Sequence, residues 1–178
     1  MSIFINLITV SRIILGAIIF VLLTKSELYF YALILFFLAS ITDYFDGFLA
    51  RKYHLVSQLG EILDPIADKI LIVFLLIGIS VNLNSYYIGF FSSIIITREI
   101  WVGALRDLNA RHSRSSATKV TFLAKIKTSF QLFTILIYLF GLSLNNMLVL
   151  LIGDIFLFLS LLVTIYTGYQ YTVSTFKK

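Results

Sequence analysis

Four regularly spaced aspartates are the residues of this sequence that most directly suggest chemistry. Asp43 and Asp46 fall on one face of a helix, and Asp64 and Asp68, at positions i and i+4, fall on one face of the next helix. Four carboxylates repel one another in a medium of low dielectric constant, so we expect bound cations to neutralise them. Oxygen ligands favour hard ions such as Mg²⁺ or Mn²⁺, and two such ions suit an in-line displacement at phosphorus. The pattern therefore predicts a site for two divalent cations.

Small residues accompany these aspartates on the same helix faces. Gly47 and Ala50 continue the face of Asp43, and Gly60 lies one turn before Asp64. Their small side chains leave room for a bulky ligand beside the carboxylates. The alternative is that the aspartates only form ion pairs that hold helices together. The basic partners would then be Arg12, Arg51, Lys69 and Arg98. Four aspartates on two facing stripes favour the metal site over this alternative.

The composition indicates that membrane-spanning helices must position these residues. Of the 178 residues, 60% are hydrophobic and only 13% are charged, which excludes an ordinary water-soluble domain. Apolar stretches of about 20 residues are long enough to cross a bilayer as helices. We expect an all-α integral membrane protein with six transmembrane helices in a single domain over 1–178. The predicted spans are 6–24, 28–50, 60–82, 85–106, 122–142 and 146–171.

The first span has the features of a retained helix. It carries Arg12 and is not followed by a small-residue cleavage site, which favours a membrane span over a signal peptide. The chain contains no cysteine, which excludes disulfides and thiolate chemistry. His54 and His112 fall in polar connections and are expected to be solvated.

The distribution of basic residues predicts the orientation in the membrane. Placing both termini in the cytoplasm leaves Lys25 outside and gathers the other loop and terminal basic residues on the inner side. These inner residues are Arg51, Lys52, Arg106, Arg111, Arg114, Lys119, Lys125, Lys127, Lys177 and Lys178. Membrane anchoring therefore explains the net charge of +5 without nucleic acid. The four aspartates, Arg12 and Arg98 fall in one layer, the aspartates at roughly 6–14 Å below the cytoplasmic edge.

The run from Asp43 to Asp68 resembles the signature of the CDP-alcohol phosphotransferases. The matching pattern is Asp43-x-x-Asp46-Gly47-x-x-Ala50-Arg51, followed by Gly60, Asp64 and Asp68. The resemblance implies six transmembrane helices, a homodimer in the cytoplasmic membrane and an active site that faces the cytoplasm. It also implies that the four aspartates hold two metal ions, which engage the pyrophosphate of a CDP-linked donor.

The resemblance further implies individual roles. Asp68 would act as the general base on the acceptor hydroxyl, with CMP as the leaving group. Asp43 and Asp46 would contact the donor as well as the metals. The other expected donor-binding residues are Gly47, Ala50 and Gly60, which would border the nucleotide, and Arg51, which would stabilise it.

Further segments are similar to the members of this family that transfer a phosphatidyl group from CDP-diacylglycerol to glycerol 3-phosphate. They are Asn6-x-x-Thr9-x-x-Arg12, Asp64-Pro65-x-Ala67-Asp68-Lys69, Arg98-Glu99, Leu105-Arg106 and Lys125-Ile126-Lys127-Thr128. The acceptor brings a phosphate dianion that needs cations outside the metal site. The candidates are Arg98, Arg106, Lys125 and Lys127. For the last three, anchoring at the inner membrane surface is the competing interpretation.

Other functions are consistent with parts of this pattern. Serine or an inositol phosphate could replace glycerol 3-phosphate as the acceptor with the same chemistry. A cation or proton-coupled transporter would also carry intramembrane acids, but the charged layer here is confined to the cytoplasmic half. A catalytically silent scaffold would tolerate the loss of a motif position, and every position of the signature is present.

Overall fold

The chain folds into long helices. The computed structural model describes residues 2–52, 58–112 and 122–177, except for the side chains of 2–8, 43–52, 58–62, 64–65 and 124–125. Over these residues it forms six α-helices and one short 3-10 helix. The elements are α1 Ser2–Leu22, η1 Ser26–Leu28, α2 Tyr29–Lys52, α3 Gln58–Asn82, α4 Tyr86–Arg111, α5 Phe122–Ser143 and α6 Met147–Phe176.

The predicted all-helical architecture is confirmed, since each predicted span coincides with one α-helix. The largest differences are at the ends of α4 and α6, which continue to Arg111 and Phe176. Polar contacts between the two helices extend over this end, where Asn109 Nδ2 donates to Thr175 Oγ1 at 2.9 Å. A prediction based on apolar length cannot detect a helix that continues beyond its apolar stretch.

Two tight turns that join consecutive helices have the same construction. Asn84 and Asn145 have φ angles of 47° and 48°, a left-handed conformation that asparagine tolerates better than most residues. The following residues, Ser85 and Asn146, donate their backbone N–H to the carbonyls of Ser80 and Gly141 at 3.0 Å. The same two residues cap the next helix with their side chains. These two turns, Asn84-Ser85 and Asn145-Asn146, which we call the asparagine turns, therefore allow α3 to reverse into α4, and α5 into α6, without a longer loop.

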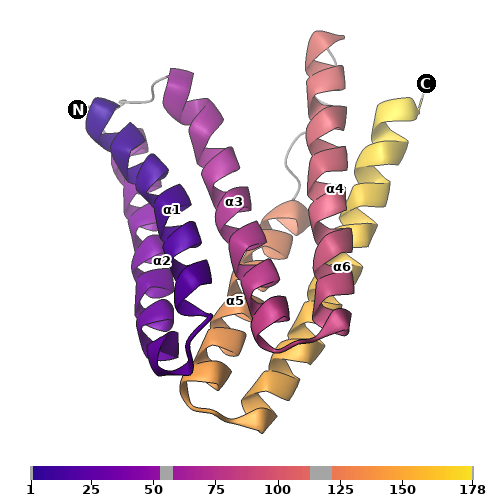
Figure 1. Ribbon diagram of the computed structural model, residues 1–178. Coiled ribbons are helices and arrows are strands. Elements are labelled where there is room, and N and C mark those ends of the chain that lie inside the picture. The colour runs from indigo at the N-terminus through magenta and orange to yellow at the C-terminus, as the bar shows by residue number, and fades with distance from the viewer. Residues whose placement is uncertain (1, 53–57, 113–121, 178) are drawn as a thin grey trace.

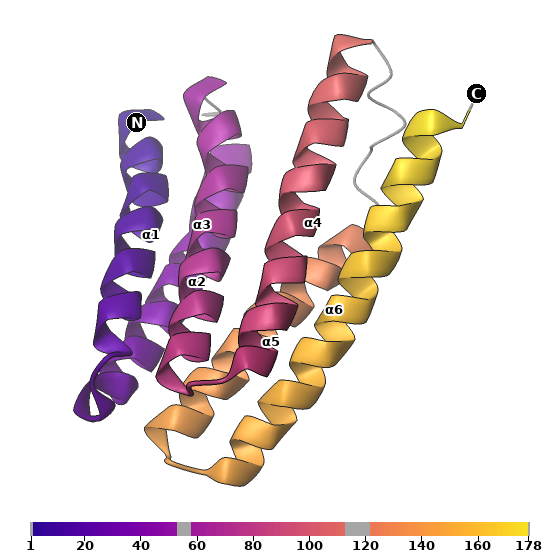
Figure 2. The same ribbon diagram turned by 45° about the vertical axis from the view of Figure 1, so that its right-hand side comes forward.

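The six helices form a ring of neighbours. Going round it, α1 contacts α2, α2 contacts α5, α5 contacts α6, α6 contacts α4, α4 contacts α3, and α3 contacts α1. Helix α3 also contacts α5 across the ring. Both chain termini lie at the same end of the bundle, together with the beginning of α3 and the end of α4 (Figure 1). The asparagine turns therefore lie at the opposite end (Figures 1 and 2).

Apolar side chains cover both the inside and the outside of the bundle. Its core includes Ile19, Leu75, Ile79, Ile135 and Leu139, all fully buried. Large apolar residues are also exposed along the outer faces, more than a water-soluble surface carries. They include Ile14, Val21, Phe37, Ile100, Leu148, Leu151 and Ile155.

Helix length and composition agree with a membrane protein. Within the described residues, Tyr86–Arg111, Ile126–Ser143 and Met147–Phe176 are each long and apolar enough to span a bilayer. Shorter apolar helical stretches lie at Thr9–Leu22 and Ser26–Thr42.

Candidate active site

Helices α2 and α3 carry the four aspartates near the end of the bundle where the termini lie. Asp43 and Asp46 lie in the last turns of α2, and Asp64 and Asp68 lie in the first turns of α3. Both helices pack against α1. The side chains of Asp43, Asp46 and Asp64 lie outside the described residues. The same is true of the side chains of Ala50 and Arg51, and of the surroundings of Gly47 and Gly60. Of the four aspartates, Asp68 is the one whose side chain lies within the described residues.

Asp68 is held by an arginine from the first helix. Arg12 Nη1 donates to Asp68 Oδ1 at 2.5 Å, and the Arg12 side chain is only 1% exposed, whereas that of Asp68 is 40% exposed. A buried guanidinium thus fixes one side of a carboxylate that stays accessible on the other. The ion-pair interpretation of the sequence is correct for this pair. It does not exclude a catalytic role, because the carboxylate still faces open space.

That open space is a cavity of about 390 Å³ between α3, α4 and α5. Asp68 and Lys69 line it from α3, and the middle of α4 and the beginning of α5 supply most of the other walls. The remaining lining residues are Ile72, Val73, Ile95, Ile96, Arg98, Glu99, Val102, Arg106, Lys127, Thr128, Ser129 and Gln131. One cavity therefore holds the proposed base and most of the proposed phosphate-binding cations.

Three of the four predicted acceptor cations meet at this cavity. Arg98 and Arg106 come from α4 and Lys127 from α5, and Arg98 and Lys127 are 9% and 5% exposed. The side chain of Lys125, the fourth candidate, lies outside the described residues. The depth of Arg98 and Lys127 argues against simple anchoring at the membrane surface, since surface anchors keep their charged groups in water.

A glutamate joins two of these cations. Glu99 Oε1 accepts hydrogen bonds from Arg98 Nη1, at 3.0 Å, and from Lys127 Nζ. Among the described side chains, Arg98 therefore forms its ion pair with Glu99. Sequence reasoning assigned no role to Glu99, although the acid directly follows Arg98 in an apolar helix. Buried ions of this kind are stabilised only when they are paired and hydrogen-bonded.

Lys69 is a second cavity residue that the sequence analysis did not assign to the site. It directly follows Asp68 and lines the same cavity. With Arg98, Arg106 and Lys127 it makes the cavity walls strongly cationic, and Asp68 and Glu99 supply the acidic groups among the described lining residues. Such a cavity favours an anionic ligand.

The described residues contain no cluster of three or more metal-ligating side chains, but three of the four predicted ligands are outside that set. The predicted ligands are all carboxylates, and Asp68 presents an accessible carboxylate beside the cationic cavity. This donor set fits hard divalent ions such as Mg²⁺ or Mn²⁺.

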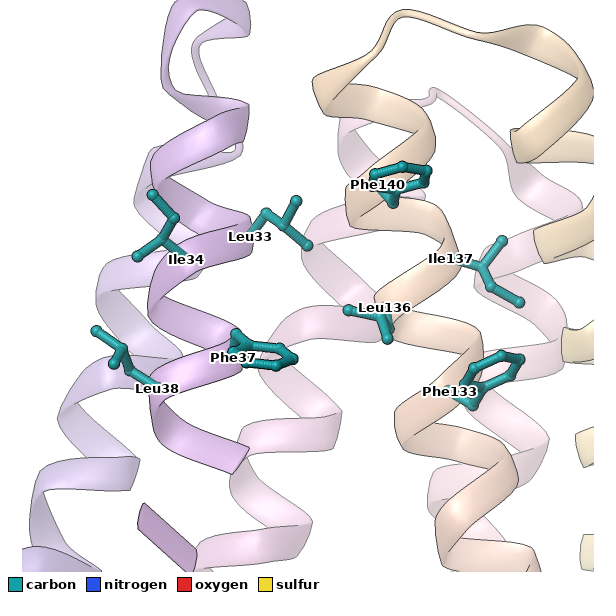
Figure 3. A pocket seen from close by; sticks show the side chains of 8 residues that line it. All are labelled: Leu33, Ile34, Phe37, Leu38, Phe133, Leu136, Ile137 and Phe140. Carbon is teal, nitrogen blue, oxygen red and sulfur yellow. The ribbon is translucent and has the colours of Figure 1, made fainter. Parts of the chain in front are cut away.

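A second cavity, between α2 and α5, has a different character. It has a volume of about 500 Å³, and every residue that lines it is apolar. Figure 3 shows Leu33 and Phe37 of α2 directed toward Leu136 of α5 across the gap. Because consecutive helical residues rise by about 1.5 Å, this groove begins less than two turns from Asp43 on the same helix.

Asp154 illustrates a carboxylate with a structural partner. Tyr138 Oη, on α5, donates to Asp154 Oδ1, on α6, at 2.6 Å. This hydrogen bond joins α5 to α6, so Asp154 contributes to the packing of these two helices.

Comparisons with known proteins add to this geometry. The family described as CDP-alcohol phosphatidyltransferase matches residues 3–166. The chain is 39% identical over 144 residues to a CDP-diacylglycerol–glycerol-3-phosphate 3-phosphatidyltransferase of Blochmanniella floridana, covering 80% of this chain and 74% of the relative. A protein of the same description from Rickettsia bellii is 42% identical over 139 residues, covering 78% and 75%. Another from Wigglesworthia glossinidia brevipalpis is 38% identical over 145 residues, covering 79% and 80%.

Proposed function

Because this chain belongs to the CDP-alcohol phosphatidyltransferase family, we propose that it transfers a phosphatidyl group from CDP-diacylglycerol to glycerol 3-phosphate. The products are phosphatidylglycerol phosphate and CMP. Membership in an enzyme family also argues against the alternative that the chain is a transporter. The observation that carries this proposal is the cavity that brings Asp68 together with Arg98, Arg106 and Lys127. A carboxylate to accept a proton and cations to hold a phosphate are what this reaction requires of the acceptor side.

The donor side of the site lies on α2 and α3. Asp43, Asp46, Asp64 and Asp68 are the residues that would hold two divalent ions, Mg²⁺ or Mn²⁺. When bound, such ions neutralise the pyrophosphate and stabilise charge that develops on the transferred phosphoryl group. The proposed nucleotide-binding residues are Asp43, Asp46, Gly47, Ala50, Arg51 and Gly60.

The apolar groove between α2 and α5 is the proposed place for an acyl chain of the donor. It lies on the same helix as Asp43 and Asp46, and its walls offer hydrocarbon contact alone (Figure 3). A lipid whose pyrophosphate meets the aspartates can therefore extend a chain along α2.

On the acceptor side, the proposed ligands of the phosphate are Arg98, Arg106, Lys127 and Lys125. Guanidinium and ammonium groups bind phosphate through charge-assisted hydrogen bonds. Such hydrogen bonds are stronger in the low dielectric of a protein interior than in water. This cationic lining favours an acceptor that carries a phosphate and disfavours serine.

The proposed reaction uses Asp68 as the general base. Its carboxylate takes the proton from the primary hydroxyl of glycerol 3-phosphate, and the oxygen forms a bond to the β-phosphorus of the donor. The bond from that phosphorus to the oxygen of CMP breaks, and CMP leaves with this oxygen. Arg12, bonded to Asp68 Oδ1, orients the carboxylate so that its accessible side faces the cavity.

The membrane arrangement is part of the same proposal. We place all six helices across the cytoplasmic membrane, with both termini and the active site on the cytoplasmic side. The positive-inside rule supports this placement, because it leaves Lys25 alone among the loop and terminal basic residues on the outer side. The family signature favours a homodimer.

The direct test is turnover by purified protein in lipid nanodiscs. Labelled CDP-diacylglycerol is supplied with Mg²⁺ and one acceptor at a time: glycerol 3-phosphate, serine or an inositol phosphate. We expect CMP release and a labelled phosphatidylglycerol phosphate product with glycerol 3-phosphate alone. Faster turnover of another acceptor would overturn the acceptor assignment, and no CMP release with any alcohol would overturn the proposed activity.

A further inference from the structure

The guanidinium of Arg98 is supported by helix α6, which runs beside α4 (Figures 1 and 2). Arg98 Nη2 donates to Thr167 Oγ1 at 2.8 Å, and Thr167 is completely buried. This bond joins residues that are far apart in the sequence. It fixes one end of the guanidinium, while Glu99 accepts from the other end through Nη1.

The next residue of α6 makes room for the stem of the same arginine. A Cβ added at Gly168 would lie 3.0 Å from Arg98 Cγ and 3.3 Å from Arg98 Nε. Both distances are tighter than ordinary van der Waals contact, so the arginine would have to shift by a few tenths of an ångström. The absence of a side chain at position 168 therefore sets how closely Arg98 lies against α6.

One turn further on, an aromatic ring contacts two of the cavity cations. The Cζ of Arg98 lies 5.8 Å from the centroid of the Tyr171 ring, and the Cζ of Arg106 lies 5.5 Å from it. Tyr171 is 3% exposed. Cation–π attraction at such distances holds both guanidinium groups near one ring although they repel one another.

We propose that Thr167, Gly168 and Tyr171 are positioning residues, which hold Arg98 and Arg106 in the arrangement that binds the acceptor phosphate. The inference rests on the proposed function, since it takes the phosphate of glycerol 3-phosphate as the ligand of Arg98. The Nε–H of Arg98 and that of Arg106 are buried without a hydrogen-bond partner among the described residues. The hydrogen bonds of Arg98 to Glu99 and Thr167 use its two Nη atoms, so its Nε–H takes part in neither bond.

Thr167, Gly168 and Tyr171 lie outside the part of the chain that matches the family, which ends at residue 166. We thereby assign a role in acceptor binding to a segment outside that match. The competing explanation is that they only pack α4 against α6.

Helix α6 offers matched controls for that explanation. Trp101 Nε1 donates to Thr172 Oγ1 at 2.9 Å, and Asn109 Nδ2 donates to Thr175 Oγ1 at 2.9 Å. These bonds join the same two helices and have nearly the same length as the Arg98–Thr167 bond, but they involve no cation of the cavity. Thr172→Val and Thr175→Val therefore remove interhelical bonds of the same type without freeing Arg98.

The experiment measures kcat and both KM values for Thr167→Val and Gly168→Ala in nanodiscs, beside the two controls and Arg98→Ala. We expect Thr167→Val to raise the KM for glycerol 3-phosphate by about tenfold, because the charged donor loses its acceptor. Gly168→Ala should raise it by about threefold, which corresponds to roughly half of that free energy. In both variants the KM for CDP-diacylglycerol and the unfolding temperature should stay near those of the Thr172→Val control.

A double variant provides a readout that packing does not move. If Thr167 acts through Arg98, Thr167→Val should cause no further rise in the acceptor KM when Arg98 is already alanine. A full additional effect in that background would overturn the inference, as would an equal rise of the acceptor KM in Thr172→Val. If Arg98→Ala itself leaves the acceptor KM unchanged, the proposed acceptor site fails and the inference fails with it. A raised KM in Arg98→Ala with normal values in Thr167→Val and Gly168→Ala refutes the inference alone.

Discussion

The two large cavities beside α5 differ in almost every property except size. The groove toward α2 is lined by apolar residues alone, whereas the cavity toward α3 and α4 contains four cations and two acids. Helix α5 contributes to both, with Lys127 and Gln131 on the charged side and Leu136 and Phe140 on the apolar side. The polar residues come from the beginning of the helix and the apolar ones from its later turns. The proposed acceptor site and the proposed acyl-chain groove therefore lie along one helix.

We assign the reaction to the charged cavity and the aspartates beside it, and removal of divalent ions should have the largest effect on the rate of this reaction. Chelation should abolish CMP release, because four carboxylates without cations cannot bind an anionic pyrophosphate. Added Mg²⁺ or Mn²⁺ should restore activity, and Ca²⁺ should do so poorly, since it prefers a looser cage of more ligands. The measurement is CMP release after dialysis against chelator. Full activity in the metal-free sample would contradict the two-metal site.

Asp68→Asn should have the next largest effect. The amide cannot accept the hydroxyl proton, so kcat should fall by roughly 10²–10⁴-fold, the usual contribution of a general base. Asp154→Asn is the matched control, because Asp154 bonds Tyr138 away from the charged cavity and its amide can still accept that bond. Single-turnover rates with saturating substrates compare the two variants. Near-normal turnover of Asp68→Asn would exclude this carboxylate as the base.

Glu99→Gln tests whether the paired cations of the charged cavity are held in place. The substitution removes the charge that joins Arg98 to Lys127, and an uncompensated buried cation costs about 3 kcal/mol. We expect a lower unfolding temperature and a rise of about tenfold in the acceptor KM, with a small change in the KM for CDP-diacylglycerol.

The control for Glu99→Gln is a pair on the surface of the same helix. Arg111 Nη2 lies 2.8 Å from Asp107 Oδ2, and the two side chains are 74% and 61% exposed. An exposed pair of this kind contributes little, so Asp107→Asn should leave stability and both KM values unchanged. If Glu99→Gln instead lowers the acceptor KM, Glu99 competes with the phosphate and does not position its ligands.

The sequence predicts the two regions unequally. The helices follow from apolar length, and the site aspartates follow from spacing, because both are local properties of the chain. Arg98 could be predicted to be functional because a charge at that depth is costly. Its partners could not be predicted. Glu99 directly follows Arg98, but adjacency in a helix does not predict an ion pair, and Thr167 is far away in the sequence. The order of helices around the ring decides these contacts, and neither hydropathy nor charge distribution determines that order.

The apolar groove is less visible still from sequence. Leu33, Phe37 and Leu136 are of the same apolar residue types as the outer surface of the bundle. Their residue types therefore do not distinguish the wall of a groove from an outer face. Only the pairing of α2 with α5 brings them together. The cationic cavity, by contrast, is indicated by charged residues within apolar helices, Arg98 above all.

The smallest expected effect belongs to the apolar groove. Leu136→Phe adds bulk to its wall and should displace part of an acyl chain (Figure 3). Loss of contact for one methylene group costs about 0.8 kcal/mol, or about fourfold in affinity. The KM for long-chain CDP-diacylglycerol should therefore rise by about this factor, and that for a short-chain analogue should rise less. The KM for glycerol 3-phosphate should not change.

Leu151→Phe is the control, because Leu151 is exposed on α6 and does not line the groove. Equal effects on long and short donors would remove the acyl chain from this groove. A change from dimer to monomer in Leu136→Phe, measured by light scattering in detergent, would instead assign the groove to a contact between two copies of the chain.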